Sequence, residues 1–193
     1  MYFTKVRENF DNQDLYEING LKFILNSLTE QVPATTPELL RLAAEWISSE
    51  IKIECDKLLT EEDKGAILIA AVSLQSGIPF GMARWYPNQL ADQISEIFSC
   101  EYVKEGTLYI SGIEKNDRVV IIDDVISTGG TMIGLIRSIE KIGATIIDII
   151  VLAEKIEYNG VQRIKTETGH DVRSLIKVSV KGEKSQVLDA ITG

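Results

Sequence analysis

The sequence predicts an α/β domain, a doubly wound and mostly parallel sheet that is flanked by helices. Two observations lead to this prediction. From residue 55 to residue 180, strand-like and helix-like segments alternate, which is the order of repeated βαβ units. The segments 118–122 and 145–153 are also rich in Val and Ile, as expected of strands buried on both faces. The 193 residues suffice for one domain of ordinary size.

The first element with clear boundaries is a helix that begins after Thr36. Residues 1–35 are expected to be irregular, apart from a short strand candidate at 21–28. Thr36 is a favourable N-cap, and Pro37 and Glu38 suit the first helical turn. Apolar residues then recur at helical spacing and predict the face that packs on the core: Leu39, Leu40, Ala43, Trp46, Ile47 and Ile51.

The βαβ pattern follows in regular order. A strand, a helix and a strand are predicted at 55–60, 66–74 and 79–84. The polar stretch 85–99 lacks a sheet pattern and is expected to be a loop, long enough to act as a mobile lid, and residues 100–112 resemble one arm of a hairpin. Further strands are predicted at 118–122, 145–153 and 172–180, and helices at 131–142, ending at Gly143, and 161–168, ending at Gly169.

The composition excludes several classes of partner. With 20 basic and 29 acidic residues, the net charge is −9, so nucleic acid and anionic membrane surfaces are not expected partners. The longest apolar runs are far shorter than the roughly 20 residues of a membrane span, and the N-terminus has no signal-peptide segment. No pair of His or Cys has metal-ligand spacing, which excludes zinc. Two cysteines in a chain of this size favour reduced thiols in a cytoplasmic protein.

The most informative segment is 119–131, Val-Val-Ile-Ile-Asp-Asp-Val-Ile-Ser-Thr-Gly-Gly-Thr. A buried strand runs into two carboxylates, and a turn of small residues then opens a helix. Backbone N–H groups and hydroxyls at such a turn suit a phosphate. The carboxylates suit a ligand that also carries hydroxyls or Mg²⁺. No Lys follows the second glycine, as a P-loop requires, and no Gly-x-Gly-x-x-Gly is present. The structural alternative is a strand that ends in a helix-capping turn.

A second candidate phosphate site lies at Glu62-Asp63-Lys64-Gly65, between a predicted strand and a predicted helix. A backbone turn with one cation could bind another phosphate group. The alternative is a solvated, charged turn that caps the helix.

At residues 119–131 the chain resembles the type I phosphoribosyltransferases. Their motif for 5-phosphoribosyl-1-pyrophosphate (PRPP) has four apolar residues, two acidic residues and a Thr-Gly-Gly-Thr-like loop. The resemblance implies a purine phosphoribosyltransferase, of the adenine type or the archaeal hypoxanthine type, which makes a nucleoside 5′-monophosphate and pyrophosphate in purine salvage. It also implies Mg²⁺ bound with PRPP, a homodimer, and a single domain over 1–193 in which 1–35 form a hood over the base and 85–105 a flexible loop.

The resemblance also assigns roles to residues. Asp123 and Asp124 would be catalytic: they would accept hydrogen bonds from the ribose hydroxyls and so steady Mg²⁺. Glu101, followed by Tyr102, would exchange a proton with the purine ring. PRPP would be bound by Asp123, Asp124 and the residues that follow them: Val125, Ile126, Ser127, Thr128, Gly129, Gly130 and Thr131. Of these, Ser127 to Thr131 would hold the 5′-phosphate. Pyrophosphate would be bound by residues at the ends of two other predicted strands: Asp63, Lys64, Gly65 and Arg84. The Asp63–Lys64 peptide is expected to be cis, and Trp85 replaces a second basic residue.

Ser127 bears on the base. Enzymes for 6-oxopurines often have an Asp at this position, so Ser127 slightly favours adenine over hypoxanthine or guanine, although archaeal hypoxanthine-type enzymes also lack that Asp. Two alternatives stay open: an orotate or uracil enzyme, and a non-catalytic, PRPP-sensing regulator with the same fold. Such regulators usually add a DNA-binding domain or a basic face. This chain is acidic, and its roughly 50 residues before the first core strand are too few for an added domain.

Overall fold

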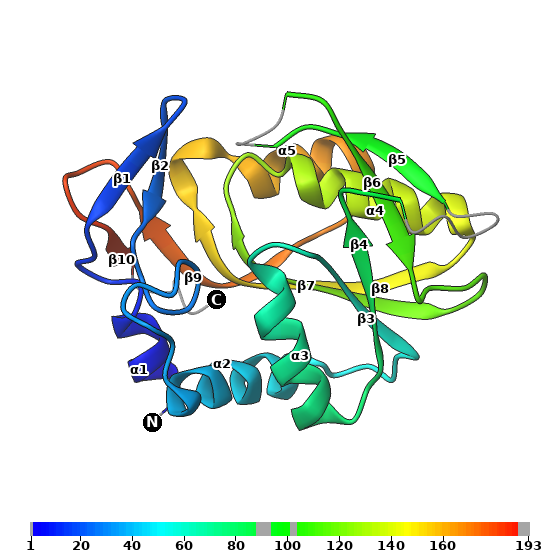
Figure 1. Ribbon diagram of the computed structural model, residues 1–193, viewed down its shortest axis with the longest axis horizontal. Coiled ribbons are helices and arrows are strands. Elements are labelled where there is room, and N and C mark those ends of the chain that lie inside the picture. The colour runs from blue at the N-terminus through cyan, green and yellow to red at the C-terminus, as the bar shows by residue number, and fades with distance from the viewer. Residues whose placement is uncertain (1, 88–93, 101–103, 189–193) are drawn as a thin grey trace.

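The centre of the molecule is an eight-stranded mixed sheet (Figure 1). The computed structural model describes residues 2–87, 94–100 and 104–188. Across the sheet the strand order is β10-β9-β8-β7-β3-β4-β6-β5. The strands are β3 (Lys57–Glu61), β4 (Phe80–Arg84), β5 (Ser95–Phe98), β6 (Gly106–Ser111), β7 (Arg118–Ile126), β8 (Thr145–Lys155), β9 (Arg173–Ser179) and β10 (Gln186–Leu188). The five central strands β9, β8, β7, β3 and β4 are parallel, and β10, β6 and β5 join the edges antiparallel.

Helices cover both faces of this sheet, which confirms the predicted fold class (Figure 1). On one face α2 (Pro37–Glu50) and α3 (Gly65–Ser76) pack against the sheet, and on the other lie α4 (Gly130–Ile142) and α5 (Gly160–Thr168). A short 3₁₀ turn, η1 (Ile156–Tyr158), precedes α5. Residues of β7 alternate between the faces: Val120 and Ile122 join the α2–α3 core, while Val119 and Ile121 join the α4–α5 core.

The helix boundaries follow the local signals in the sequence. The side chain of Thr36 accepts a hydrogen bond from the Leu39 N–H, as expected of the N-cap of α2. Gly143 and Gly169 adopt left-handed conformations, with φ of +82° and +78°, where α4 and α5 end. No helix of the described part of the chain is long and apolar enough to cross a membrane.

Two predictions about the middle of the chain are wrong in detail. The strand predicted at 118–122 continues to Ile126, because β8 is long enough to pair with β7 as far as Ile126 and Glu154. Both aspartates therefore lie within the C-terminal half of a strand and not after it. The expected loop 85–99 contains β5, which pairs with β6 as a hairpin. Its pattern is weak because it is an edge strand in which only Phe98 is buried.

The N-terminal residues are more regular than expected. Helix α1 (Tyr2–Glu8) is followed by a hairpin of β1 (Leu15–Ile18) and β2 (Leu21–Ile24), which forms a separate two-stranded sheet. Its two-residue turn, Asn19-Gly20, has φ of +53° and +81°, a geometry that Asn-Gly favours.

The segment that ends in β10 holds this N-terminal unit in place. Ser185 Oγ accepts a hydrogen bond from the Gln13 N–H at 2.9 Å and donates one to the Phe10 carbonyl at 2.7 Å. Lys22 Nζ donates to the Gly182 carbonyl at 2.8 Å. Two parts of the chain that are far apart in sequence are thus bonded together beside the β1–β2 hairpin.

Candidate active site

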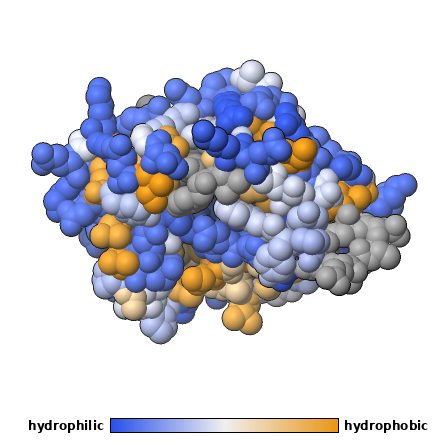
Figure 2. Space-filling view, turned by 45° about the horizontal axis from the view of Figure 1, so that its top comes forward, coloured by the Kyte–Doolittle hydropathy of each residue, from blue (hydrophilic) through white to orange (hydrophobic). Residues whose placement is uncertain are grey.

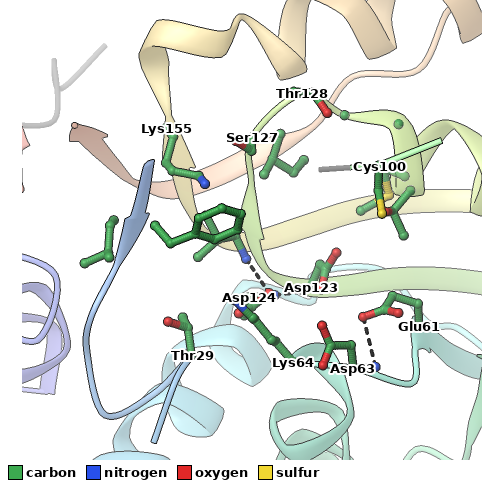
Figure 3. Close-up of a pocket in the computed structure, with 18 of the residues that line it drawn as sticks. Thr29, Glu61, Asp63, Lys64, Cys100, Asp123, Asp124, Ser127, Thr128 and Lys155 are labelled. Atoms are coloured by element: carbon green, nitrogen blue, oxygen red, sulfur yellow. Dashed lines mark hydrogen bonds between the residues drawn. The ribbon is translucent and has the colours of Figure 1, made fainter. Parts of the chain in front are cut away.

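A pocket opens where the parallel strands β3, β7 and β8 end, the usual ligand site of an open α/β sheet (Figure 3). The empty space in the pocket and at its open mouth, solvent included, is about 780 Å³. One wall is the continuous segment from Asp123 to Met132. Opposite walls come from the β3–α3 turn and from the β1–β2 hairpin with the residues that follow it. The two candidate phosphate sites predicted from the sequence therefore face one cavity.

The acidic pair lies at the bottom of this pocket. Asp123 and Asp124 are both buried, at 7% and 5% exposure. Asp123 Oδ1 accepts from the Asp124 N–H at 3.0 Å, and Asp124 Oδ1 accepts from the Val125 N–H at 2.7 Å. Asp124 Oδ2 is buried and has no hydrogen-bond partner among the described residues. A buried acceptor of this kind is costly unless a ligand supplies a donor or a cation.

The electrostatics of the pair point the same way. Burial, and then the charges of Asp124 and Glu61, raise the pKa of Asp123 well above its ordinary value. Burial also raises the pKa of Asp124 to about 6, and the nearby ammonium of Lys64 opposes this shift. A bound group that donates hydrogen bonds or carries positive charge would favour the ionised form of both side chains.

The turn after β7 has the geometry of an anion site. Gly129 adopts φ of +79° and precedes α4, whose N-terminus has no side-chain cap among the described residues. Ser127 Oγ is buried without a partner in the part of the chain that the structure describes. An added Cβ at Gly130 would lie 1.7 Å from the Ser99 carbonyl oxygen, so this position requires glycine. Open N–H groups at the start of a 13-residue helix, beside a free hydroxyl, suit a phosphate.

Helix α5 supports this turn from behind. A Cβ at Gly160 would lie 2.1 Å from the Ser127 carbonyl oxygen, so the start of α5 touches the turn directly. Arg163 Nη1 donates to the Thr128 carbonyl at 3.2 Å. Neither contact had a signal in the sequence, because both depend on how α5 packs against α4.

The β3–α3 turn brings Asp63 and Lys64 to the pocket. Lys64 Nζ forms an ion pair with Glu30 and lies 5.1 Å from the centroid of the Phe23 ring. A Cβ at Gly65 would lie 2.7 Å from Asp123 Oδ1, so this turn packs closely against the acidic pair. The prediction of a cis Asp63–Lys64 peptide is wrong: the only cis peptide in residues 2–87, 94–100 and 104–188 is Val32–Pro33. The trans form is favoured by about 3 kcal/mol at a non-proline bond.

Arg84 does not line the pocket as the structure describes it. Its Nε lies 3.9 Å from Glu62 Oε2. The next residue, Trp85, lines the pocket, and its indole Nε1–H donates to Glu61 Oε2 at 3.0 Å. Glu61 was missed because an acidic residue at the end of a strand is unremarkable in sequence. Burial, and then the charges of Asp63 and Asp124, raise the pKa of Glu61 to about 7.

The hairpin side of the pocket contains a lysine that the sequence did not single out. Lys155 ends β8 and is 3% exposed. Its Nζ donates to the Lys22 carbonyl at 3.0 Å and lies 4.5 Å from the centroid of the Phe23 ring. Figure 3 shows Lys155 across the pocket from Asp63 and Glu61. Glu101 and Tyr102 lie outside the described residues, as do residues 88–93 of the predicted flexible loop.

Comparison with known proteins identifies the family. Residues 31–186 match the model of the phosphoribosyl transferase domain. A hypoxanthine/guanine phosphoribosyltransferase of Methanotorris igneus is 38% identical over 86% of this chain and 90% of its own length. Another, of Methanobacterium lacus, is 32% identical over 96% of both chains.

Solved structures show the same fold. The adenine phosphoribosyltransferase of Giardia lamblia, complexed with 9-deazaadenine, has a TM-score of 0.78 at 23% identity, covering 92% of this chain and 98% of that one. The adenine phosphoribosyltransferase of Rhodothermus marinus has a TM-score of 0.74 at 25% identity, covering 91% and 98%. The family model spans most of the chain, and it includes the pocket-lining residues except those on the hairpin side, Phe23, Ile24, Thr29 and Glu30. This chain belongs to the phosphoribosyltransferase family, whose enzymes catalyse pentosyl transfer from PRPP.

Proposed function

We propose that this protein transfers the phosphoribosyl group of PRPP to a purine base and releases pyrophosphate. One observation carries the proposal: Asp124 Oδ2 and Ser127 Oγ are both buried, both lack partners among the described residues, and both belong to one pocket wall. A ribose 5-phosphate has hydroxyls for the first and a phosphate for the second. The named relatives, at 32% and 38% identity, support the purine as acceptor.

Each part of PRPP then has a place. The 5′-phosphate binds at the N-terminus of α4, with Ser127 to Thr131 around it. The ribose hydroxyls donate to Asp123 and Asp124. The diphosphate lies over Asp63, Lys64 and Gly65, and Lys64 exchanges its bond with Glu30 for one with the diphosphate. Arg84 takes part only if its side chain leaves Glu62.

The residues also account for the chemistry. Positive charge develops on the ribose as the bond to the diphosphate breaks, and the two carboxylates beneath it stabilise that charge. Within the described ranges no three His, Cys, Asp or Glu side chains are placed to hold a metal. We propose that Mg²⁺ arrives with PRPP and that Asp123 and Asp124 reach it through the ribose hydroxyls, for which Asp124 Oδ2 is an open acceptor among the described residues. Glu101 is proposed to exchange a proton with the base.

The hairpin side of the pocket is proposed to bind the base. An ammonium only donates hydrogen bonds, so Lys155 suits the oxygen of a 6-oxopurine better than the amino group of adenine. The names of the relatives agree with this choice. We therefore favour hypoxanthine or guanine, in contrast to the slight preference for adenine that Ser127 suggested.

A panel of bases tests the proposal. The protein is mixed with PRPP, Mg²⁺ and one of hypoxanthine, guanine, adenine, uracil or orotate, and pyrophosphate release is measured. We expect release with hypoxanthine or guanine at the highest kcat/KM. Release with uracil or orotate alone would contradict a purine acceptor. PRPP binding without release for any base would instead favour the regulator.

A homodimer is also proposed, through the outer face of α3. Three large apolar side chains there and on β4 are exposed, with Leu74 at 89% and Ile67 and Phe80 at 41%. In Figure 2 apolar side chains gather at the lower edge of the view, where Figure 1 places α3. Light scattering on wild type and on L74K tests this. We expect wild type to be a dimer and L74K to dissociate to monomers more readily. A monomeric wild type would refute it.

The acidic composition and free thiols agree with a cytoplasmic location.

A further inference from the structure

Two neighbouring glutamates at the end of β3 hold Trp85 by both of its N–H groups. The Trp85 backbone N–H donates to Glu62 Oε1 at 2.8 Å, and its indole Nε1–H donates to Glu61 Oε2 at 3.0 Å. Trp85 follows β4 directly, so these bonds join the exits of two neighbouring strands. The ring also meets Phe98 edge-on, with the centroids 5.4 Å apart.

Glu61 uses its second oxygen for the candidate pyrophosphate turn. Glu61 Oε1 accepts from the Asp63 N–H at 3.0 Å, while Oε2 holds the indole. The side chain is 6% exposed and lines the pocket with Trp85 and Asp63. One carboxylate therefore fixes both the turn that presents Lys64 and the aromatic wall beside it.

We propose that Glu61 is a positioning residue for PRPP, acting through the Asp63 amide and the Trp85 indole to set the turn from Glu62 to Gly65. This inference rests on the proposed function, because it assumes that the turn binds the diphosphate. Trp85 occupies the position at which similar enzymes often have a second basic residue. In this chain a neutral ring stands there, and a hydrogen-bonded link to the turn takes the place of a charge.

The cost of the arrangement argues against a purely structural link. A carboxylate buried beside Asp63 and Asp124 experiences repulsion from both. A neutral side chain could fill the same space without this penalty. Glu61 is the better residue only if both N–H donors must be held at once, since a carboxylate has two acceptor oxygens and a glutamine amide has one.

The first test is steady-state kinetics on E61Q, W85F and the double variant. The new amide of E61Q could accept from one N–H and would direct its own hydrogens at the other. We therefore expect the KM for PRPP to rise about tenfold, the worth of one hydrogen bond to a charged group. We expect kcat and the KM for the base to change less than about threefold. W85F removes only the indole donor and should raise the same KM.

The double variant separates a link from two independent effects. If Glu61 acts through Trp85, E61Q should cost less in the W85F background than in wild type. The matched control is W46F, because Trp46 is a core residue of α2 that does not line the pocket. W46F should lower thermal stability and leave both KM values within about twofold.

A second readout does not depend on turnover. In the W46F background Trp85 is the remaining tryptophan, since the chain has two. Adding pyrophosphate with Mg²⁺ should change its fluorescence. E61Q should raise the pyrophosphate concentration that gives half of this change about tenfold. This inference alone is overturned by an active wild type whose E61Q and W85F forms keep the KM for PRPP, and whose W46F/E61Q form keeps the fluorescence response of W46F. A wild type that releases no pyrophosphate with any base overturns the proposed function instead.

Discussion

Gly130→Ala tests the phosphate-binding turn most directly, because the expected conflict is with the backbone. The added Cβ would lie 1.7 Å from the Ser99 carbonyl oxygen and 2.9 Å from its carbon. Non-bonded carbon contacts need roughly 3.5 Å, so the two segments must separate by more than 1 Å or so. The start of α4 would move relative to Asp124. A displacement of about 1 Å in a positioned site costs on the order of a hundredfold in rate.

We therefore expect G130A to lower kcat/KM for PRPP by about a hundredfold, and to lower the unfolding free energy by about 1–3 kcal/mol, as overpacking does. Pyrophosphate release gives the first quantity and urea denaturation the second. Gly134→Ala is the matched control on the same helix. Its Cβ would lie 2.8 Å from Phe98 Cβ and 2.9 Å from Leu108 Cδ1, which are side-chain atoms away from the pocket.

G134A should show a stability change of similar size with kcat/KM within about threefold of wild type. A G130A variant with the wild-type kcat/KM for PRPP would refute the proposed position of the phosphate. Equal losses of activity in both variants would also refute it, since the effect would then follow stability and not the position of the phosphate.

Three other substitutions probe separate parts of the pocket. Asp124→Asn keeps the shape but removes the charge, and should lower kcat at least about tenfold to a hundredfold; an unchanged kcat and PRPP affinity would reject its role. Lys155→Met should lower kcat/KM for hypoxanthine and guanine at least about tenfold and spare adenine; equal losses for all purines would reject the base assignment. The pKa of Glu61 is raised from 4.5 to about 7, so the folded protein favours the protonated side chain. The stability that the protonated form gives is fully present below the unfolded-state pKa and is lost as pH rises through about 7. Relative to wild type, E61Q should thus gain about 3 kcal/mol in unfolding free energy between about pH 5 and about pH 8; a constant difference in urea titrations would contradict the shift.

The part of the candidate site that could be predicted from the sequence lies within thirteen contiguous residues, 119–131. Asp123, Asp124 and the turn from Ser127 to Thr131 are adjacent in the chain, so a strand and a helix suffice to bring them together. The parallel sheet followed from the same alternation of elements. The Asp63–Gly65 turn was also located, because it occupies the same place after another strand.

The residues that were missed depend on contacts between distant segments. Glu61 matters because Trp85 reaches it from the next strand, and Lys155 because the β1–β2 hairpin brings Phe23 to it. Neither residue has a local pattern that marks it. The extent of β7 was also hidden, since two carboxylates are unfavourable inside a strand unless a partner strand and a ligand site accompany them.

The bonds that join Phe10, Gln13 and Lys22 to residues 182–185 bear on how the protein is made. Chains fold while they are synthesised, at roughly 5–20 residues per second. The strands and turns proposed to bind PRPP are all synthesised before residues 182–185. The hairpin proposed to cover the base can form its bond to the Gly182 carbonyl only after them. The residues for the sugar donor are thus all made before the last bonds that hold the acceptor side can form.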